Sequence, residues 1–143
     1  MNHFTLKEIS NLEEMLPNLA LVQQLYPDFT GEKYQSLLEK MLPHNYFQLV
    51  VFENEKPVGL TGFWVGHKLW CEKYLEIDNL IVHRDYRSKG IGQLIFDYLT
   101  EKAKNEDCSM LALDSYTDNF PAHKFFYNDG FAPRGFHFIK KLS

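Results

Sequence analysis

The sequence predicts an α/β domain. Strand-like and helix-like patterns follow one another from end to end of the chain, and the clearest amphipathic helix comes directly after an apolar strand. At 143 residues, of which 45% are hydrophobic and 15% aromatic, the chain is long enough for one domain with a well-filled core. We therefore expect residues 1–143 to form a single domain, built from the elements described next.

The N-terminal part of the chain predicts one strand followed by two helices. His3–Ile9 alternates apolar and polar residues, as a half-buried strand does. Apolar residues at helical spacing extend over Leu12–Tyr26, where Pro17 is expected to break or restart the helix. After a short loop, Glu32–Met41 predicts the second helix.

The middle of the chain predicts a β-hairpin. Tyr46–Phe52 is dense in β-forming residues, Glu53–Lys56 has the composition of a turn, and Val58–Trp64 predicts the returning strand. The returning strand is unusually rich in glycine, which indicates bulges or close packing. These glycines are Gly59, Gly62 and Gly66.

Tyr74–Val82 predicts the next strand, with an irregularity near its middle. The apolar positions begin on one phase with Leu75 and Ile77 and continue on the other with Leu80. Because side chains alternate strictly along a strand, this slip predicts a β-bulge at Asp78-Asn79.

The C-terminal part of the chain predicts two helices and two strands. Ile91 begins the clearest amphipathic helix, and Met110–Leu113 predicts a short buried strand. Pro121–Asn128 predicts a helix that is opened by proline and closed by Gly130. Phe131–Ile139 predicts a last strand that completes the sheet, so the expected order is β-α-α-β-β-β-α-β-α-β.

Composition excludes several functional classes. A net charge of −4 argues against a general nucleic-acid binder, and no apolar run is long enough to cross a membrane. Two cysteines, Cys71 and Cys108, are too few for a disulfide framework, and no signal-peptide pattern is present, so we expect a cytoplasmic protein. The six histidines show no paired ligand spacing, so no metal site is expected.

The segment after Val82 has the composition of an anion site. Arg87 and Lys89 supply positive charge, and Gly90 and Gly92 let a ligand approach the backbone at the point where a helix begins. The first N–H groups of a helix are unpaired, and the helix dipole adds partial positive charge there. We therefore expect this loop to bind a phosphate or pyrophosphate.

Two sequence blocks resemble one known family. Arg87-Ser-Lys-Gly90-Ile-Gly92 resembles the acyl-CoA loop Arg/Gln-x-x-Gly-x-Gly/Ala of the GCN5-related N-acetyltransferase (GNAT) family. Asn119-x-x-Ala122, followed by Phe125-Phe126 and Gly130-Phe131, resembles its second signature. The resemblance covers roughly residues 46–141, and it implies a mixed, mostly antiparallel sheet splayed open at the acyl-CoA site.

The resemblance implies that acetyl-CoA is the acyl donor and lies in the gap between the strands ending at Val82 and at Leu113. Pantetheine amides would pair with backbone groups that the splay leaves unpaired. The backbone groups in question are those of Leu80, Ile81 and Val82. The pyrophosphate would lie on Arg87, Ser88, Lys89, Gly90, Ile91 and Gly92. Asn119 would contact pantetheine or cap its helix, and Phe126 would pack against the cofactor.

The sequence offers more than one candidate for the general base and for the general acid. Glu76, six residues before Val82, occupies the position at which GCN5-like members of the family place a base glutamate, and Asp78 is the rival. The position usually filled by the proton-donating tyrosine is Phe126, and Tyr127 follows it. One residue along a helix rotates a side chain by about 100 degrees, so Tyr127 reaches the sulfur only if the helix is shifted; Tyr116 is a further candidate.

The acceptor is expected to be a primary amine, on a small molecule or a protein, that receives the acetyl group directly in a ternary complex. An aromatic and acidic surface suits a cationic amine. The residues expected to form this surface are Tyr26, Asp28, Phe29, Tyr34, Trp64, Trp70 and Glu72. The alternative is a non-catalytic acyl-CoA sensor, suggested by Phe126. A homodimer is a further expectation, since dimers are common among proteins that resemble this one.

Overall fold

The computed structural model describes residues 3–142, and the chain divides into two compact units, one up to Leu113 and one from Asp114 onward. The first unit contains β1 (Phe4–Ile9), α1 (Leu12–Met15), α2 (Leu19–Leu25), α3 (Gly31–Met41), β2 (Tyr46–Glu53), β3 (Lys56–Lys68), β4 (Glu72–Val82), α4 (Ile91–Asn105) and β5 (Met110–Leu113). The second contains α5 (Phe120–Asn128). The predicted elements up to α5 are thus confirmed.

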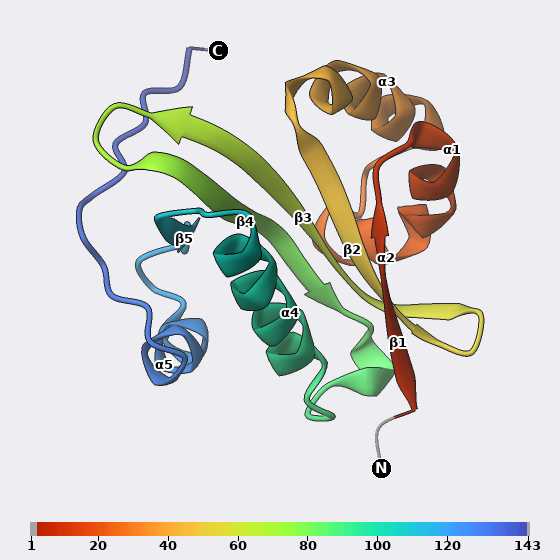
Figure 1. The fold of residues 1–143 in the computed structure, drawn as a ribbon. Coiled ribbons are helices and arrows are strands. Elements are labelled where there is room, and N and C mark those ends of the chain that lie inside the picture. The colour runs from red at the N-terminus through yellow and green to blue at the C-terminus, as the bar shows by residue number, and fades with distance from the viewer. Residues whose placement is uncertain (1–2, 143) are drawn as a thin grey trace. The chain divides into compact units, whose positions relative to one another are not determined.

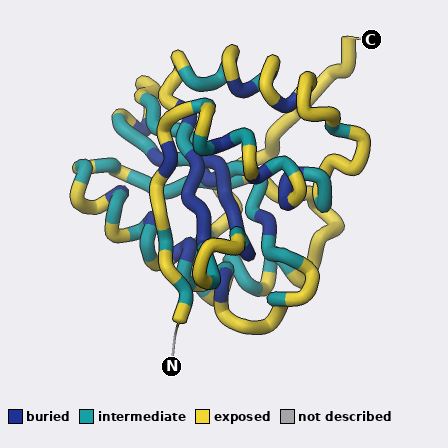
Figure 2. Tube along the Cα trace, turned by 90° about the vertical axis from the view of Figure 1, so that its right-hand side faces the viewer, coloured by how far each residue is buried: buried dark blue, intermediate teal, exposed yellow. Residues whose placement is uncertain are grey.

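The strands of the first unit form one sheet in the order β1-β2-β3-β4-β5. Every neighbouring pair is antiparallel except β4 and β5, which run parallel with α4 as their crossover (Figure 1). Helices α1 to α3 contact one face of the sheet, and α4 contacts the other. Figure 2 shows the buried residues gathered in the middle of the trace. Strand β5 is only half-buried, whereas the sequence predicted a buried strand.

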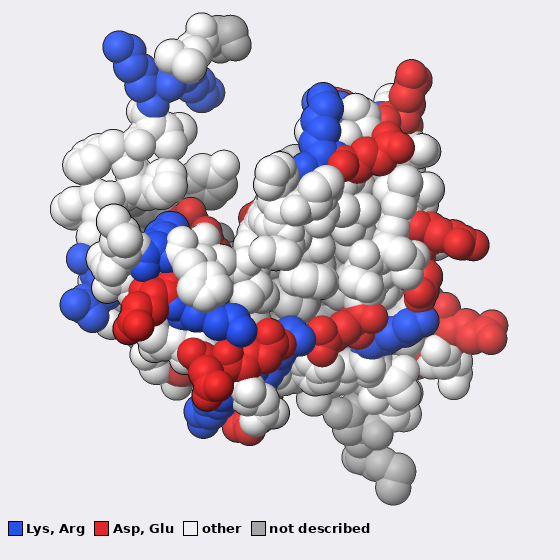
Figure 3. Space-filling view, turned by 45° about the horizontal axis from the view of Figure 1, so that its top comes forward, with Lys and Arg blue, Asp and Glu red and all other residues white. Residues whose placement is uncertain are grey.

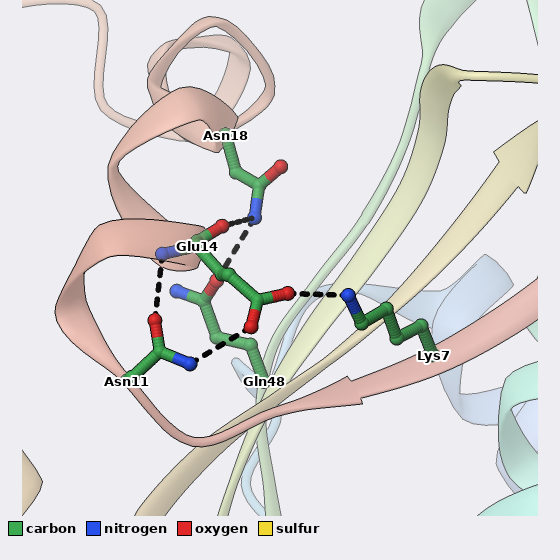
Figure 4. A network of polar contacts seen from close by, with 5 residues as sticks. All are labelled: Lys7, Asn11, Glu14, Asn18 and Gln48. Carbon is green, nitrogen blue, oxygen red and sulfur yellow. Dashed lines mark hydrogen bonds and ion pairs between the residues drawn. The ribbon is translucent and has the colours of Figure 1, made fainter.

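Pro17 interrupts the first helical segment, as predicted. It lies in a short 3-10 turn, Leu16–Asn18, between α1 and α2. Asn11 begins α1 by accepting a hydrogen bond at Oδ1 from the Glu14 N–H at 2.9 Å, and the Glu14 carboxylate pairs with Lys7 (Figure 4). Asn18 donates to the Gln48 side chain at 3.2 Å. These contacts fasten the start of the helical region to the sheet.

Two glycines of β3 are required by close packing, one on each face of the sheet. A Cβ at Gly62 would lie 2.5 Å from the Tyr46 hydroxyl, on the α1–α3 side. A Cβ at Gly59 would lie 2.6 Å from Cγ2 of Ile91, the first residue of α4. The close packing that the sequence indicated is therefore confirmed, and it brings the start of α4 directly onto the sheet.

The second unit differs from the prediction after α5. Gly130 closes the helix with φ +96°, as expected, but the segment predicted as a strand at 131–139 is irregular. Pro133 has no N–H to donate to a ladder, and no strand in the described chain pairs with this segment. Phe136 and Phe138 are 85% and 89% exposed. Residues 131–139 include β-forming side chains, but no described strand pairs with them, so they do not form a strand.

Candidate functional site

The predicted β-bulge is present in β4. Ile81 lies opposite Leu60, but the next pair in the register is Asp78 opposite Gly62, so that two residues of β4 face one residue of β3. Asn79 carries the irregularity with a left-handed φ of 56°. The bulge twists β4 at the point where it leaves its other neighbour.

The sheet is splayed at this point, as the family resemblance implied. Strand β5 pairs only with Tyr74–Ile77 of β4, and the following residues to Val82 pair with β3 alone. The His83 N–H donates to the Val58 carbonyl at 2.8 Å. Backbone groups alternate along an antiparallel ladder, so, counting back from His83, those of Val82 point to the open edge and those of Ile81 point to β3. Leu80 lies within the bulge, where this alternation is interrupted.

The expectation that Leu80, Ile81 and Val82 all leave backbone groups unpaired is therefore wrong. Ile81 faces β3, and the Val82 carbonyl accepts a hydrogen bond from Gln24 Nε2 at 3.0 Å. Gln24, on α2, also accepts at Oε1 from the Arg84 N–H at 3.2 Å. This contact could not be predicted from local sequence patterns, because Gln24 and Val82 are far apart in the chain.

The loop after β4 presents a helix start to solvent. Its residues from Arg87 to Gly90 are exposed, Gly90 has φ +81°, and α4 begins at Ile91. Apart from Gly90 itself and its two chain neighbours, no described residue lies within 4 Å of the position of a Gly90 Cβ, and the first turn of α4 contains no acidic residue. This open space, together with helix N–H groups and the charges of Arg87 and Lys89, fits a phosphate or pyrophosphate.

Tyr86 fixes the shape of this loop from inside. Its hydroxyl donates to Glu53 Oε1 at 2.6 Å, and Lys89 Nζ lies 5.2 Å from the centroid of its ring. The hydrogen bond from Tyr86, with a second from His3, holds the pKa of the Glu53 carboxyl below its usual value. Glu53 thus remains an acceptor at neutral pH and holds the tyrosine ring beneath Lys89.

An open cleft of about 510 Å³ lies on the α1–α3 side of the sheet. Glu76 lines it from β4, beside Trp64, which is its register partner on β3, and Tyr74. The remaining lining residues are Pro43, His44, Asn45, Val65, Gly66 and His67. The predicted base is therefore in a cleft, on the same strand that carries the open edge.

Asp78, the rival to Glu76, is held by a neighbour. Its Oδ2 accepts a hydrogen bond from Trp64 Nε1 at 3.0 Å, and it lines neither this cleft nor the pocket described next. The Trp64 ring also contacts Tyr46 at a centroid distance of 4.9 Å. Trp64 and Tyr46 together separate the cleft from the neighbouring pocket.

That pocket, of about 190 Å³, lies between α2, α3 and the bulge. Tyr26, Phe29 and Tyr34, expected at the acceptor site, line this pocket, and Tyr26 accepts a hydrogen bond from Asn79 at 2.6 Å. The other expected acceptor residues, Asp28, Trp70 and Glu72, are exposed and line neither hollow. The acceptor surface predicted from composition thus divides between two hollows and the outer surface.

The second sequence block lies in the second unit. Asn119 is at the N-cap position of α5, but its side chain makes no capping hydrogen bond, so the capping role expected for it is not observed. Phe126 is half-buried, with its ring centroid 6.1 Å from that of Phe131. Tyr127 and Tyr116 are 59% and 84% exposed. The side chains at 126 and 127 therefore have different surroundings, as one-residue helical rotation requires.

Sequence reasoning missed two polar residues of the cleft, His44 and His67. His44 lies in a short 3-10 turn before β2, and His67 lies near the end of β3. Their meeting depends on the pairing of β2 with β3, in which Tyr46 lies opposite Trp64. If the β2–β3 pairing is predicted correctly and continued a few residues beyond Tyr46 and Trp64, it places His44 near His67.

Three further observations concern other kinds of site. No group of three or more His, Cys, Asp or Glu side chains that could hold a metal ion occurs among residues 3–142. The helices within that range include none with the length and apolarity to cross a bilayer. On the face shown in Figure 3, basic side chains are interspersed with acidic ones. That face therefore offers no extended basic surface of the kind that nucleic acids bind.

Comparison with known proteins identifies the family. Residues 14–131 match the model of the acetyltransferase (GNAT) family. The uncharacterized N-acetyltransferase YhdJ of Bacillus subtilis is 24% identical over 139 residues, which cover 96% of this chain and 98% of that protein. The family match covers most of the chain, including the bulged strand, the glycine loop and the second sequence block.

Solved structures share the fold. Aminoglycoside N-acetyltransferase AAC(6')-Iy in complex with CoA superposes with a TM-score of 0.81 at 16% identity, covering 99% of this chain and 96% of that one. Glucosamine-6-phosphate N-acetyltransferase from Arabidopsis thaliana gives 0.76 at 18% identity, covering 99% and 100%. At these identities the likeness shows the fold alone. Together with the family match, the splayed sheet and the glycine loop show that the chain belongs to the GNAT family and is an N-acetyltransferase.

Proposed function

We propose that the protein transfers an acetyl group from acetyl-CoA to a primary amine, by direct transfer in a ternary complex. The observation that carries this proposal is the position of Glu76, which lines the cleft on the same strand that presents the open edge beyond it. A base for the acceptor and backbone groups for the donor thus belong to one strand, β4. Relatives of this fold include enzymes named for small-molecule amines.

The residues available for the cofactor fit its chemistry. When bound, acetyl-CoA supplies an acyl group already activated as a thioester. Beyond Ile77 the edge of β4 has no pairing with β5, so backbone groups of this segment are available to pantetheine, and the exposed loop offers helix N–H groups and two cations to a pyrophosphate. The proposed set is Leu80, Ile81, Val82, Arg87, Ser88, Lys89, Gly90, Ile91, Gly92, Asn119 and Phe126. Ile91 can contribute only its backbone, because its side chain is packed against β3.

In the proposed mechanism Glu76 accepts the proton that the amine loses, directly or through a water. Asp78 is the weaker candidate, because it lines neither the cleft nor the neighbouring pocket. The backbone N–H of Leu80 or its neighbour is proposed as the hydrogen-bond donor to the thioester oxygen. Tyr127 is proposed as the proton donor to the leaving thiolate on its sequence position, which follows the usual tyrosine position by one residue.

The family match also supports a proposal about domain organisation. It extends over residues 14–131 and therefore covers most of the first unit and more than half of the second. We accordingly propose that residues 1–143 form one acetyltransferase domain. The sequence block around Asn119 would then serve the same reaction as the glycine loop.

The first experiment measures the thermal midpoint of the protein with acetyl-CoA, CoA and ATP. At a hundred times its dissociation constant a ligand stabilises the fold by about 2.7 kcal/mol, a readily measured shift. We expect a shift with acetyl-CoA and CoA and none with ATP. A protein that responds equally to ATP, or to none of the three, would contradict the proposed cofactor.

The second experiment measures thiol release with acetyl-CoA and a panel of primary amines. Glu76→Gln should lower kcat by roughly a hundredfold or more, since general-base catalysis contributes about 10²–10⁴. The acetyl-CoA thermal shift should be kept. Glu72→Gln, an exposed residue of the same strand, is the matched control. Tyr127→Phe tests the proton donor. Tight acetyl-CoA binding with no amine-dependent release would favour an acyl-CoA sensor instead.

A further inference from the structure

We propose that the acceptor amine also carries an anionic group, a carboxylate or a phosphate, which the cleft binds at the end opposite to Glu76. The inference rests on the proposed function, because it takes Glu76 as the group that meets the amine. It narrows that function from any primary amine to one class of acceptor.

The cleft is polar, and a positive charge lies beside it. Glu76 is the carboxylate among its lining residues, and His44 and His67 are the other titratable groups apart from the Tyr74 phenol. Both histidines are exposed. An imidazole N–H can donate a hydrogen bond to an anion.

The register of β3 and β4 orders these groups along the cleft. Glu76 lies opposite Trp64, Tyr74 opposite Gly66, and Glu72 opposite Lys68. Side chains two residues apart share a face, so Glu76 and Tyr74 are neighbours there, separated by about 7 Å along the strand. The order from the bulge toward the hairpin tip is thus carboxylate, aromatic ring, then lysine.

Lys68 lies outside the cleft lining but brings a full positive charge beside this end of the cleft. Its Nζ lies 5.0 Å from the centroid of the Tyr74 ring, and Tyr74 lines the cleft. Within residues 3–142 no carboxylate lies within 4 Å of this ammonium group. Tyr74 is held flat against the strand, because a Cβ at Gly66 would lie 2.7 Å from its hydroxyl. Glu76 and Lys68 therefore flank one fixed ring.

Two nearby charges of the hairpin do not change this polarity. Lys73 is directed elsewhere, since its Nζ donates to the Glu106 carbonyl at 2.9 Å. Glu72 is exposed and, like Lys68, forms no ion pair among the described residues. A negatively charged Glu72 weakens the field of Lys68, and both side chains lie outside the cleft lining. Side chains alternate along β3, so Lys68 shares the face of Trp64 and Gly66, whereas the His67 side chain points to the other face. The anion-binding end therefore consists of Lys68 and His44.

This charge pattern selects between acceptor classes. A diamine that places one ammonium group at Glu76 would bring its second ammonium group toward Lys68, and like charges at close range repel. A molecule with an amine at one end and an anion at the other satisfies both ends of the cleft. An ω-amino acid and an aminoalkyl phosphate share this chemistry, and a panel of probes can distinguish them.

The test compares four acceptors in steady-state kinetics with saturating acetyl-CoA: 4-aminobutyrate, 3-aminopropyl phosphate, butylamine and 1,4-diaminobutane. We expect at least one of the two anionic probes to exceed both others in kcat/KM by about twofold to fivefold, the effect of one exposed charge contact. The better of the two anionic probes identifies carboxylate or phosphate as the preferred group. Preference for butylamine or 1,4-diaminobutane would overturn the inference.

Variants at position 68 locate the effect. Lys68→Gln should raise KM for the anionic probe about twofold to fivefold with little change in kcat, and should leave butylamine unaffected. Lys68→Arg should restore most of the KM effect, and Lys40→Gln, at an exposed lysine of α3, is the matched control. Equal effects of Lys68→Gln on all four probes would overturn the inference.

The same experiments separate this inference from the function on which it rests. A normal thermal response to acetyl-CoA with turnover of none of the four probes would overturn the acceptor class and leave cofactor binding intact. Turnover of butylamine with no preference for anions would overturn the acceptor class alone. No thermal response to acetyl-CoA would overturn the proposed function and this inference together.

Discussion

On the α4 side of the sheet the buried side chains are closely packed and, apart from Thr61, apolar, whereas the α1–α3 side buries the amides of Asn18 and Gln48 and two tyrosine hydroxyls. Ile95, Phe96 and Leu99 of α4 are fully buried against a face that includes Phe63. On the opposite face Gln48 is 1% exposed and bonds to two tyrosines. Both hollows described above lie on that second face.

The contrast between the two faces separates two tasks of the fold. Close apolar packing on the α4 side fixes the helix whose first residues form the anion loop. Hydrogen bonds on the other side fix the side chains at definite distances and angles, so they do not collapse onto one another and space for an acceptor remains. Apolar packing alone would close such space, because interiors pack to the density of crystals.

The largest expected effect concerns the α4 side. Phe96→Ala should lower the free energy of unfolding by about 3–5 kcal/mol, because it removes a fully buried ring and leaves a cavity. Urea denaturation followed by circular dichroism measures the change. Glu101→Ala, on the exposed side of the same helix, should change stability by at most about 0.5 kcal/mol. A loss below about 1 kcal/mol for Phe96→Ala would contradict the packing contrast.

The next effect concerns the buried polar network. Gln48→Leu should lower the free energy of unfolding by about 1–3 kcal/mol, because it leaves buried polar partners unsatisfied. Gln48 Nε2 lies 3.0 Å from the Tyr34 hydroxyl and 3.3 Å from the Tyr46 hydroxyl. Burial raises the pKa of Tyr34 and of Tyr46, so both phenols remain neutral and the cost should not vary between pH 6 and 8.

A double-mutant cycle sharpens this second prediction. Tyr46→Phe removes one of the two hydroxyls that Gln48 contacts, so the double variant with Gln48→Leu should be less destabilised than the sum of the single variants. Strict additivity, measured by the same urea titrations, would show that the two side chains do not act as one network.

The smallest expected effect concerns the surface contact between β1 and α4. Lys102 Nζ lies 2.8 Å from Glu8 Oε1, and the Tyr98 hydroxyl donates to Glu8 Oε2 at 2.6 Å. Burial opposes ionisation of Glu8, but these hydrogen bonds outweigh it and lower the pKa of the carboxyl. Glu8→Gln should therefore cost about 0.5–1 kcal/mol at neutral pH, a value typical of exposed ion pairs.

The pH dependence of that variant follows from the direction of the shift. A carboxyl whose pKa is lowered in the folded state stabilises the fold above its unfolded pKa, and this contribution disappears as the pH falls through the folded value. The difference between wild type and Glu8→Gln should be constant from pH 6 to 8 and should shrink below about pH 4. A difference that grows on acidification would contradict the proposed role of Glu8.

Features that leave a local trace in the sequence could be predicted, and features that depend on distant partners could not. The bulge at Asn79 was predicted because an extra residue shifts the apolar alternation, and Pro17 marked the break between α1 and α2. The bond from Gln24 to Val82 joins residues of separate elements and leaves no such trace. The predicted strand at 131–139 was wrong for the same reason, since its pairing partner is not encoded locally.

In the candidate site, too, the local features could be predicted and the contacts between distant residues could not. The glycine loop is a contiguous stretch, so its charges and its left-handed glycine could be recognised from the sequence. Glu76 was selected by its spacing from that loop, and its place in the cleft was found in the structure. The meeting of His44 with His67 requires the β2–β3 register, which neither segment specifies by itself.

The strand order of the sheet has a consequence for how the chain folds. Since β2, β3 and β4 are neighbours in both sequence and space and are joined by short turns, their pairing closes small loops at low entropic cost. The parallel pairing of β4 with β5 must wait until α4 has formed between them. During synthesis, which proceeds from the N-terminus, the strands that line the cleft therefore emerge before the last strand of the sheet has been synthesised.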